Sequence, residues 1–330
     1  MIVVLHEALG SSARADELDA LVQVREVTGA LERLRLRAAA CPIGLDLATG
    51  LEAIGAAQPH CVFNLVEALG GHGELIGVVP RLLASAGIPF TGCSADALTL
   101  TSHKIAAKRL MAAAGIATPE WLEDGGPRGD DTGRWIVKSL WEHASFGLDD
   151  SSVVTGRQAA RALVEERSRE HGGKWFAERY VEGREFNLSL LERGGEPEVL
   201  PVAEMTFVDW APGRPRIVGY AAKWDESDHD YRATRRVFPR LAPRLRDALH
   251  ETALRCWRLF ELSGYARVDI RLDERGVPWV LEVNANPCLA SDAGFAAAAA
   301  RAGIGYDRLV GLILEAALPE ENALGRHIGL

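Results

Sequence analysis

The sequence predicts an α/β protein with a parallel N-terminal sheet, followed by a part of α+β type. Residues 1–98 alternate short apolar runs with helical patterns, which is typical of a small parallel α/β unit. After residue 171 several strand-like runs follow one another across short turns, which favours antiparallel pairing. At 330 residues the chain exceeds the usual length of one domain. We therefore expect three domains, at residues 1–98, 99–180 and 181–330.

In the N-terminal unit, apolar runs at residues 2–5 and 61–65 predict strands. Apolar residues at helical spacing predict helices at 17–37 and 74–86. The run GIPFTG at 87–92 begins with turn residues and predicts a third strand.

In the middle part, a lysine-bearing helix is expected at residues 100–114, because Gly115 and Pro119 supply helix stop signals. Two strands and one helix are expected after it, at 135–140, 175–181 and 156–171 respectively. In the last part, strands are expected at 185–191, 198–205 and 216–223, followed by a long helix at 240–262. A hairpin at 264–284, which turns at 273–276, and a final helix at 306–317 complete the prediction.

Composition excludes several classes of protein. The net charge of −9 argues against a nucleic-acid surface, which needs a basic patch, so small-molecule partners are expected. No apolar stretch reaches the roughly 18 residues of a membrane span, and the first residues lack a signal-peptide pattern. The five cysteines show neither metal-site spacing nor a disulfide pattern. A reducing cytoplasm fits this composition.

Lysine is rare in this chain. Lys and Arg total 37, yet lysine stands only at 104, 108, 138, 174 and 223. A compact ammonium on a flexible stem suits a phosphate oxygen, whereas Arg imposes a planar fork. The retained lysines are therefore candidates for phosphate contacts, with chance retention as the alternative.

The hairpin at 264–284 carries the strongest chemical signal. Arg267 and Asp269 share one face of their strand, Glu282 and Asn284 share another, and Val268, between the first two, is apolar. Pairing across the turn would bring two carboxylates and an amide together beside a guanidinium. Carboxylates this close repel unless a cation lies between them, and an all-oxygen ligand set favours Mg²⁺. The alternative is an ordinary hairpin with charges on its solvent face.

Together with the hairpin sequences RVD (267–269) and VLEVNANP (280–287), further motifs stand in one order. They are FNL (63–65), GIPFTG (87–92), KRL (108–110), AGIATP (114–119), EGREF (182–186) and AK (222–223), with Lys104 ahead of KRL. In this order the chain resembles the ATP-grasp enzymes, and specifically the D-alanine–D-alanine ligase family. The resemblance implies a Rossmann-like pre-ATP-grasp domain followed by a two-lobed ATP-grasp fold. It also implies an ATP-dependent ligase that joins two small amino acids through an acyl-phosphate, as a cytoplasmic homodimer.

The resemblance also implies a nucleotide site. Lys104 and Lys138 match phosphate-binding positions, and Lys223 matches the residue that approaches the γ-phosphate. Glu178 would face the adenine amino group, Val181 would supply a backbone contact to the ring, and Glu185 would bind the ribose hydroxyls. For each residue the alternative is a structural role: the two glutamates as solvated strand residues, and the lysines as caps of local structure.

The resemblance assigns the metal and the chemistry to the hairpin. Asp269, Glu282 and Asn284 match the family's magnesium ligands, with two ions expected and Mn²⁺ as a possible substitute. Arg267 matches the residue that stabilises the acyl-phosphate and the tetrahedral oxyanion. The alternative for Glu282 is an ion pair with Arg267 alone. Ser145 is a predicted catalytic residue, together with Arg267 and Lys223, and lies in the loop 142–150, which closes over the phosphates in the family. The neighbouring histidines, His103 and His143, are expected to be polar loop residues.

The sequence departs from the family where the first amino acid binds. The family links an N-terminal glutamate to a loop serine and a tyrosine, but this chain has Ala144 and Trp224 at the latter two positions. Its segments 11–17, 67–68 and 288–293 also differ from the family pattern. The substrate pair therefore stays open between a D-alanine–D-alanine ligase-like pair and another dipeptide of specialised metabolism. A phosphotransferase or a non-catalytic nucleotide-binding module is the alternative of a different class.

Overall fold

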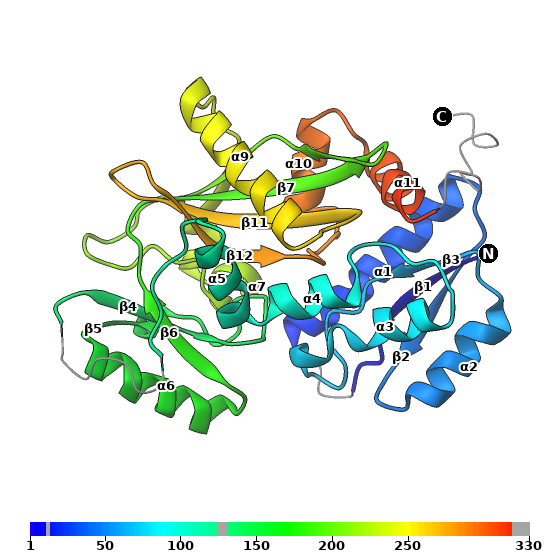
Figure 1. The fold of residues 1–330 in the computed structure, drawn as a ribbon, viewed down its shortest axis with the longest axis horizontal. Helices are drawn as coiled ribbons and strands as arrows, with labels where there is room; N and C mark the ends of the chain where they lie inside the picture. Colours follow the sequence, from blue (N-terminus) through cyan, green and yellow to red (C-terminus); the bar gives the residue numbers. More distant parts are fainter. Residues whose placement is uncertain (11–13, 124–130, 319–330) are drawn as a thin grey trace.

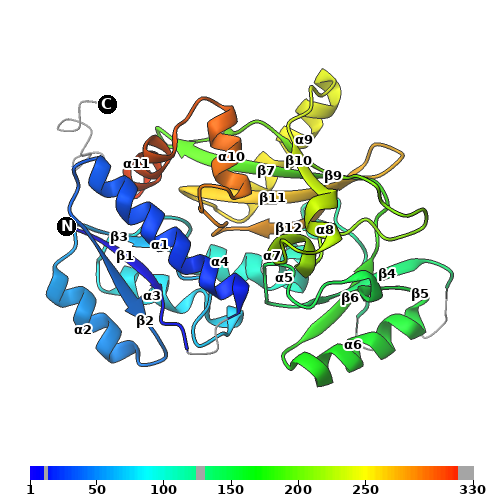
Figure 2. The same cartoon turned by 180° about the vertical axis from the view of Figure 1, so that it is seen from behind.

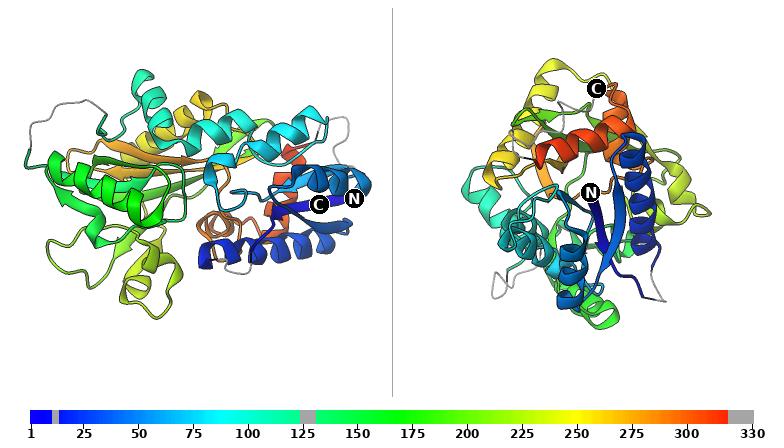
Figure 3. Two further views of the ribbon diagram at one scale, coloured as in Figure 1. Left: turned by 90° about the horizontal axis from the view of Figure 1, so that it is seen from below. Right: turned by 90° about the vertical axis from the view of Figure 1, so that its right-hand side faces the viewer.

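The computed structural model describes residues 1–10, 14–123 and 131–318, and within these ranges the strands form three sheets (Figure 1). The N-terminal sheet and the middle sheet lie toward opposite ends of the long axis, and the large sheet lies between them (Figures 1 and 3). No helix in the described ranges is long and apolar enough to cross a membrane.

The N-terminal sheet is parallel, as the sequence predicts. Its strand order is β2-β1-β3, and every residue of the central strand is buried. Helix α1 packs on the first two strands, and α2 packs on β2. The elements are β1 (Ile2–Glu7), α1 (Ala15–Arg33), β2 (Ala38–Ile43), α2 (Leu47–Ala57), β3 (Cys61–Asn64) and α3 (Val78–Ser85).

Two helices, α4 (Ala95–Ser102) and α5 (Lys104–Ala113), stand where the sequence predicts one helix at 100–114. The chain breaks at His103, whose ψ of 90° is not helical. The Nδ1 atom of His103 accepts a hydrogen bond from the backbone N–H of Ala106, so this residue caps the second helix. The break makes Lys104 the first residue of α5.

The middle sheet is small and antiparallel, in the order β5-β4-β6. Helix α6 covers it with a core of its own that includes Trp135, Leu163 and Trp175 (Figure 1). The elements are β4 (Arg134–Ser139), β5 (Val153–Thr155), α6 (Arg157–His171) and β6 (Trp175–Arg179).

The large sheet is antiparallel, in the order β10-β9-β7-β11-β12, with β8 paired to β7. Helix α9 packs on β7, β11 and β12, and α11 packs on α1 (Figure 2). Residues of α1, β1, β11 and α11 share one hydrophobic core. The elements are β7 (Arg184–Arg193), β8 (Glu196–Val199), β9 (Ala203–Phe207), α7 (Tyr220–Trp224), α8 (His229–Ala233), β10 (Thr234–Val237), α9 (Pro243–Leu259), β11 (Tyr265–Leu272), β12 (Pro278–Asn284), α10 (Gly294–Arg301) and α11 (Tyr306–Ala316).

Two predicted strands are absent from the described part of the chain, and the strand predicted at 198–205 is instead two strands, β8 and β9, separated by residues 200–202. Residues 216–223 form no strand and end in the short helix α7, because the segment is held against the loop 142–150. The backbone N–H of Tyr220 donates to the carbonyl of Leu148 at 2.8 Å, and a Cβ on Gly219 would lie 2.9 Å from that carbonyl oxygen. Residues 87–92 make only a single parallel bridge, between Val62 and Phe90. The three sheets fall within the three predicted domains, whose boundaries stay a prediction.

Candidate active site

The register of the β11–β12 hairpin gathers four predicted residues on one face. Arg267 pairs with Asn284, and Asp269 pairs with Glu282. Side chains two residues apart on a strand point to the same face, and directly paired residues also share a face. The register shifts just after Asp269, so Ile270 pairs with Val280. The two carboxylates, the amide and the guanidinium therefore project together from the paired part of the hairpin.

Asp269 is held on two sides. Arg267 donates to both of its carboxylate oxygens, with Nε–Oδ1 at 2.8 Å and Nη2–Oδ2 at 2.9 Å. Asn187 on β7 donates from Nδ2 to Oδ1 at 2.7 Å. Burial would lower the pKa of Arg267, but Asp269 and Glu282 more than reverse this and raise it. The guanidinium is therefore a permanent cation with a fixed orientation.

Glu282 is joined to the loop 142–150 through a histidine. His143 Nδ1 and Glu282 Oε1 share a short hydrogen bond, and His143 Nε2 lies 3.1 Å from Ser102 Oγ. Burial would raise the pKa of Glu282, yet Lys104, His143 and Arg267 hold it well below its usual range. The expectation that His143 is only a polar loop residue missed this contact, and an ion pair with Arg267 alone is wrong.

Two of the predicted phosphate lysines lie beside the hairpin. The ammonium of Lys104 donates to the carbonyl of Glu142 at 2.7 Å. Burial lowers the pKa of Lys104, and the negative charge of Glu282 is the largest effect that opposes this lowering. Burial also lowers the pKa of Lys223, whose charged neighbours are Arg267, Asp269 and Glu282. Lys104 therefore has Glu282, and Lys223 has both Asp269 and Glu282, among its charged neighbours.

The third predicted lysine, Lys138 on β4, meets Glu178 on β6. Lys138 Nζ lies 2.6 Å from Glu178 Oε1, and Lys108 Nζ lies 2.5 Å from Oε2. The Glu178 side chain is only 1% exposed, so the solvated alternative is wrong. Burial would raise the pKa of Glu178, but the two lysines lower it. Lys108 was not among the predicted site residues, although it stands four residues after Lys104 and so on the same side of a helix.

Arg271 binds both Val181, predicted to contact the adenine ring, and Glu185, predicted to bind the ribose. It is 3% exposed, and its guanidinium donates to the carbonyl of Val181 at 3.0 Å and to Glu185 at 2.5 Å. It also contacts the carbonyl of Arg216 and the hydroxyl of Tyr180. Burial would lower the pKa of Arg271, but Glu185 and Tyr180 raise it. No sequence pattern predicts this role for Arg271, because its partners come from separate segments.

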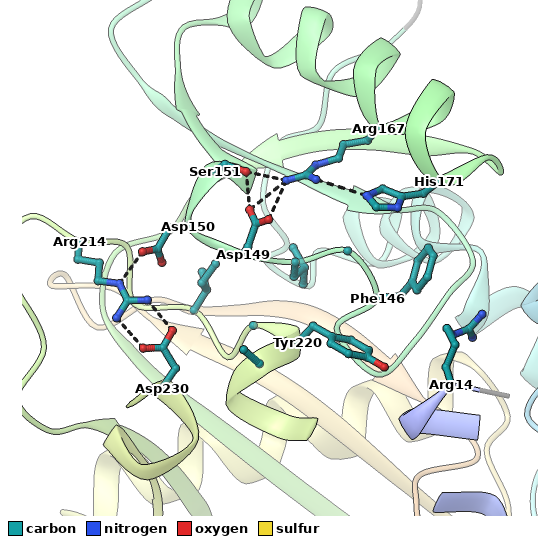
Figure 4. A pocket seen from close by; sticks show the side chains of 15 residues that line it. Arg14, Phe146, Asp149, Asp150, Ser151, Arg167, His171, Arg214, Tyr220 and Asp230 are labelled. Carbon is teal, nitrogen blue, oxygen red and sulfur yellow. Dashed lines mark hydrogen bonds and ion pairs between the residues drawn. The ribbon is translucent and has the colours of Figure 1, made fainter. Parts of the chain in front are cut away.

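The loop 142–150 packs against the segment before α7. Ala144 and Ser145 both have positive φ, of 58° and 62°. Ser145 Oγ donates to the carbonyl of Val218 at 2.7 Å, and Trp224 Nε1 donates to the carbonyl of Ala144 at 3.1 Å. A cavity of about 670 Å³ lies beside this loop, lined by Phe146, Leu148, Arg167, His171 and Tyr220 among others (Figure 4). Phe146 and Tyr220 point into it from the loop and from α7 (Figure 4).

Helix α1 lies against the segment that departs from the family after Pro287. Cys288 Sγ donates to Asp19 Oδ2 at 3.1 Å, and the backbone N–H of Leu289 donates to Gln23 at 2.9 Å. Burial raises the pKa of Asp19 and raises that of Glu67 to about 7. Of the departing segment 11–17, residues 11–13 lie outside the described part of the chain.

The predicted metal set fits a hard divalent cation. Asp269 and Glu282 are directly paired across the strands with side-chain exposures of 14% and 24%, and Asn284 adds an amide oxygen beside them. Like charges placed opposite each other destabilise a sheet, so a bound cation would relieve this pair. Within the described ranges no three His, Cys, Asp or Glu side chains form a metal-binding group. The set thus depends on Asn284 and leaves positions for ligands from outside the protein.

Comparisons with known proteins find matches over most of the chain. The family model described as "D-ala D-ala ligase C-terminus" matches residues 135–315. A D-alanine–D-alanine ligase of Chromohalobacter salexigens is 34% identical, over 82% of each chain. The corresponding enzyme of Methylococcus capsulatus is 32% identical, over 77% of each chain. A Sinorhizobium fredii protein named y4sG is 31% identical, over 78% of this chain and 74% of its own.

Solved structures share the fold. The D-alanine–D-alanine ligase of Bacillus anthracis complexed with ATP superposes with a TM-score of 0.73 at 21% identity, over 96% of each chain. D-alanyl-alanine synthetase A of Vibrio cholerae gives a TM-score of 0.72 at 18% identity, over 96% of this chain and 98% of its own. The predicted ATP-grasp fold is therefore confirmed. The chain belongs to the D-alanine–D-alanine ligase family, whose members use ATP and a divalent metal, and it is an ATP-dependent ligase.

Proposed function

We propose that this ligase forms a peptide bond between two small amino acids through an acyl-phosphate. The observation that carries the proposal is the shared face of Arg267, Asp269, Glu282 and Asn284. Lys104 and Lys223 share Glu282 as a charged neighbour, and Lys223 also has Asp269. This set combines ligands for a divalent cation with fixed cations for phosphate oxygens, and a protein that only binds nucleotide has no need of the guanidinium.

In this proposal the nucleotide lies between Glu178 and the hairpin. Lys104 and Lys138 bind the phosphates, and Lys223 approaches the γ-phosphate. Glu178 accepts a hydrogen bond from the adenine amino group, and Glu185 accepts hydrogen bonds from the ribose hydroxyls. Two observations support this direction: Glu178 is buried, and Lys104 has both Glu178 and Glu282 among its charged neighbours.

Asp269, Glu282 and Asn284 would hold the metal, as two Mg²⁺ ions or as Mn²⁺ in their place. When bound, the metal would neutralise charge on the phosphate oxygens. The ionised state of Glu282 at neutral pH, held by Lys104 and His143, suits this role. Removal of divalent cations would therefore stop ATP consumption.

The reaction has two steps. An oxygen of the first amino acid's carboxylate attacks the γ-phosphorus, the bond from that phosphorus to the oxygen of ADP breaks, and ADP leaves. The amine nitrogen of the second amino acid then attacks the acyl carbon and loses a proton, and the carbon–oxygen bond to phosphate breaks. Arg267 stabilises the oxyanion of this second step. The loop around Ser145 contributes by excluding water and contacting phosphate.

The relatives from Chromohalobacter salexigens and Methylococcus capsulatus are named D-alanine–D-alanine ligases. In this chain, however, different residues stand at the binding site expected for the first amino acid. The indole N–H of Trp224 donates to the carbonyl of Ala144, where the family pairs a tyrosine with a serine. This contact favours a second candidate, a dipeptide ligase of specialised metabolism with another substrate pair. We also propose that the active form is a homodimer, as the resemblance implies.

Release of ADP and phosphate tests the proposal. The purified protein is incubated with ATP, Mg²⁺ and a panel of single amino acids and amino-acid pairs, and products are identified by mass spectrometry. The proposal requires a dipeptide, with one ADP and one phosphate released per peptide bond. Phosphorylation of a single substrate without a second amine would instead indicate a phosphotransferase.

A further inference from the structure

Glu178 is a buried carboxylate with one lysine on each oxygen. Lys108 and Glu178 are each 1% exposed at their side chains, whereas Lys138 is 16% exposed. Glu178 lies diagonally from Lys138 on the same face of the β4–β6 pair, because Lys138 pairs with Phe176. The two lysines thus approach the carboxylate from different depths.

The inner lysine is fixed from behind by a chain of hydrogen bonds. Lys108 Nζ donates to Thr118 Oγ1 at 2.9 Å, and the hydroxyl of Thr118 donates to the carbonyl of Val280 at 2.9 Å. Val280 lies on β12, whose next residues include the hairpin carboxylate Glu282. Lys108 is therefore attached to both the middle sheet and the large sheet.

The outer lysine has one partner. In the described part of the chain, Glu178 is the only side chain that pairs with Lys138. A lysine assigned to an ATP phosphate must leave this carboxylate when the nucleotide binds. A buried carboxylate that loses its sole counter-ion is strongly disfavoured, so this exchange needs a second cation that stays.

We propose that Lys108 is a positioning residue that holds Glu178 in place as an acceptor for the adenine amino group, while Lys138 moves from Glu178 to a phosphate of ATP. The inference rests on the nucleotide site of the proposed function and adds a residue and an exchange to it. The amino group donates to Oε1, the oxygen that Lys138 releases, and Oε2 stays on Lys108. Inosine triphosphate carries a carbonyl where adenine has the amino group, so it would meet the carboxylate with a second acceptor.

Lys108→Met tests the inference by removing the inner charge while keeping an unbranched apolar stem. Lys138 is then the sole counter-ion of Glu178 and stays on it. The KM for ATP rises roughly 10- to 100-fold, the range for loss of one charge-assisted hydrogen bond. The preference for ATP over inosine triphosphate in kcat/KM, measured side by side, falls toward one. Lys174→Met, at an exposed lysine, is the matched control and leaves both values unchanged.

A double variant, Lys108→Met with Glu178→Gln, separates positioning from packing. The neutral glutamine releases Lys138, so the KM for ATP returns to within a few-fold of wild type. The preference for ATP stays lost, because the amide of glutamine donates as well as accepts. If the single variant does not fold, the KM for ATP and the nucleotide preference of the double variant still test the inference. Thermal melting shows which variants are folded.

Three results are decisive against the inference. A folded Lys108→Met protein with unchanged KM and unchanged nucleotide preference overturns it. A double variant whose KM is no better than that of the single variant assigns Lys108 to packing alone and overturns it too. If the wild-type protein itself does not prefer ATP to inosine triphosphate, the assignment of Glu178 in the proposed function fails together with the inference.

Discussion

Replacing Glu282 by Gln removes one charge from the predicted metal set and keeps the shape of the side chain. This glutamate faces Asp269 across the hairpin and bonds to His143. The glutamine amide still offers a hydrogen-bond partner to the imidazole. The variant should therefore fold, and lose the charge that a divalent cation needs.

The two effects on stability oppose each other. A hydrogen bond to a charged group contributes about 1.5–3 kcal/mol and a neutral one about 1 kcal/mol, so the His143 contact weakens by about 0.5–2 kcal/mol. Relief of the repulsion with Asp269 returns up to about 1 kcal/mol. The variant also loses the attraction of Glu282 to Lys104 and Arg267, so the net effect is a loss of about 1 kcal/mol or more and a lower Tm. The loss in kcat is at least roughly 100-fold, as for removal of one preorganised electrostatic group.

The assay pairs turnover with melting. Initial rates of phosphate release are measured with the best amino-acid pair from the panel, and Tm is measured with and without MgATP. Wild type gains Tm on binding MgATP, and Glu282→Gln gains much less. Glu274→Gln, an exposed acid in the turn of the same hairpin, is the control with normal values. A folded Glu282→Gln protein with wild-type kcat would refute the metal assignment.

Three further predictions follow from other parts of the site. Lys138→Ala should weaken ATP binding by about 2 kcal/mol in calorimetry, and unchanged affinity would mean that β4 does not reach the phosphates. With D-alanine alone, the specificity constant should be at least ~100-fold lower than with the best pair, because the indole of Trp224 only donates a hydrogen bond whereas a tyrosine hydroxyl also accepts one. Efficient turnover of D-alanine in the panel would contradict this prediction. Burial raises the pKa of Glu67 from 4.5 to about 7. Between these two pH values the folded protein binds more protons than the unfolded chain, so the unfolding free energy falls by up to about 3 kcal/mol as the pH rises from 4.5 to about 7. Urea unfolding at about pH 5 and about pH 8 should show that loss in wild type and not in Glu67→Gln, and equal pH dependence of the two proteins would exclude it.

The hairpin was predictable because its geometry is set locally. Strand alternation places Arg267 with Asp269 and Glu282 with Asn284, and the turn between them fixes the pairing to within one irregularity. The N-terminal sheet was predictable in part for the same reason, since β1 begins with four apolar residues and β3 with three. By contrast β2 was missed, because its residues begin with three alanines and much of it is exposed.

Contacts between distant segments were beyond the sequence. Arg271 joins a carbonyl from each of two segments to Glu185, and no local pattern distinguishes it from the many surface arginines. His143 was set aside as a loop residue, since only the fold brings the loop onto Glu282. The strand predicted at 216–223 failed because contacts with the loop 142–150, and not its own apolar residues, decide its conformation. The helix α10 was also missed, although its alanine run is a strong helix signal.

The scarcity of lysine and the acidity of the whole chain have a common explanation at this site. A protein with a net charge of −9 repels a polyanion at long range, so the positive charge that ATP requires must be concentrated where the phosphates bind. Four of the five lysines, at 104, 108, 138 and 223, lie within this set of charges, and burial lowers the pKa of three of them, Lys104, Lys108 and Lys223. Each of these buried lysines has carboxylates among its charged neighbours, which opposes that lowering and favours the cation before ATP arrives. A flexible ammonium can then exchange a carboxylate for a phosphate oxygen, whereas a bidentate guanidinium such as that of Arg267 stays where its partner fixes it.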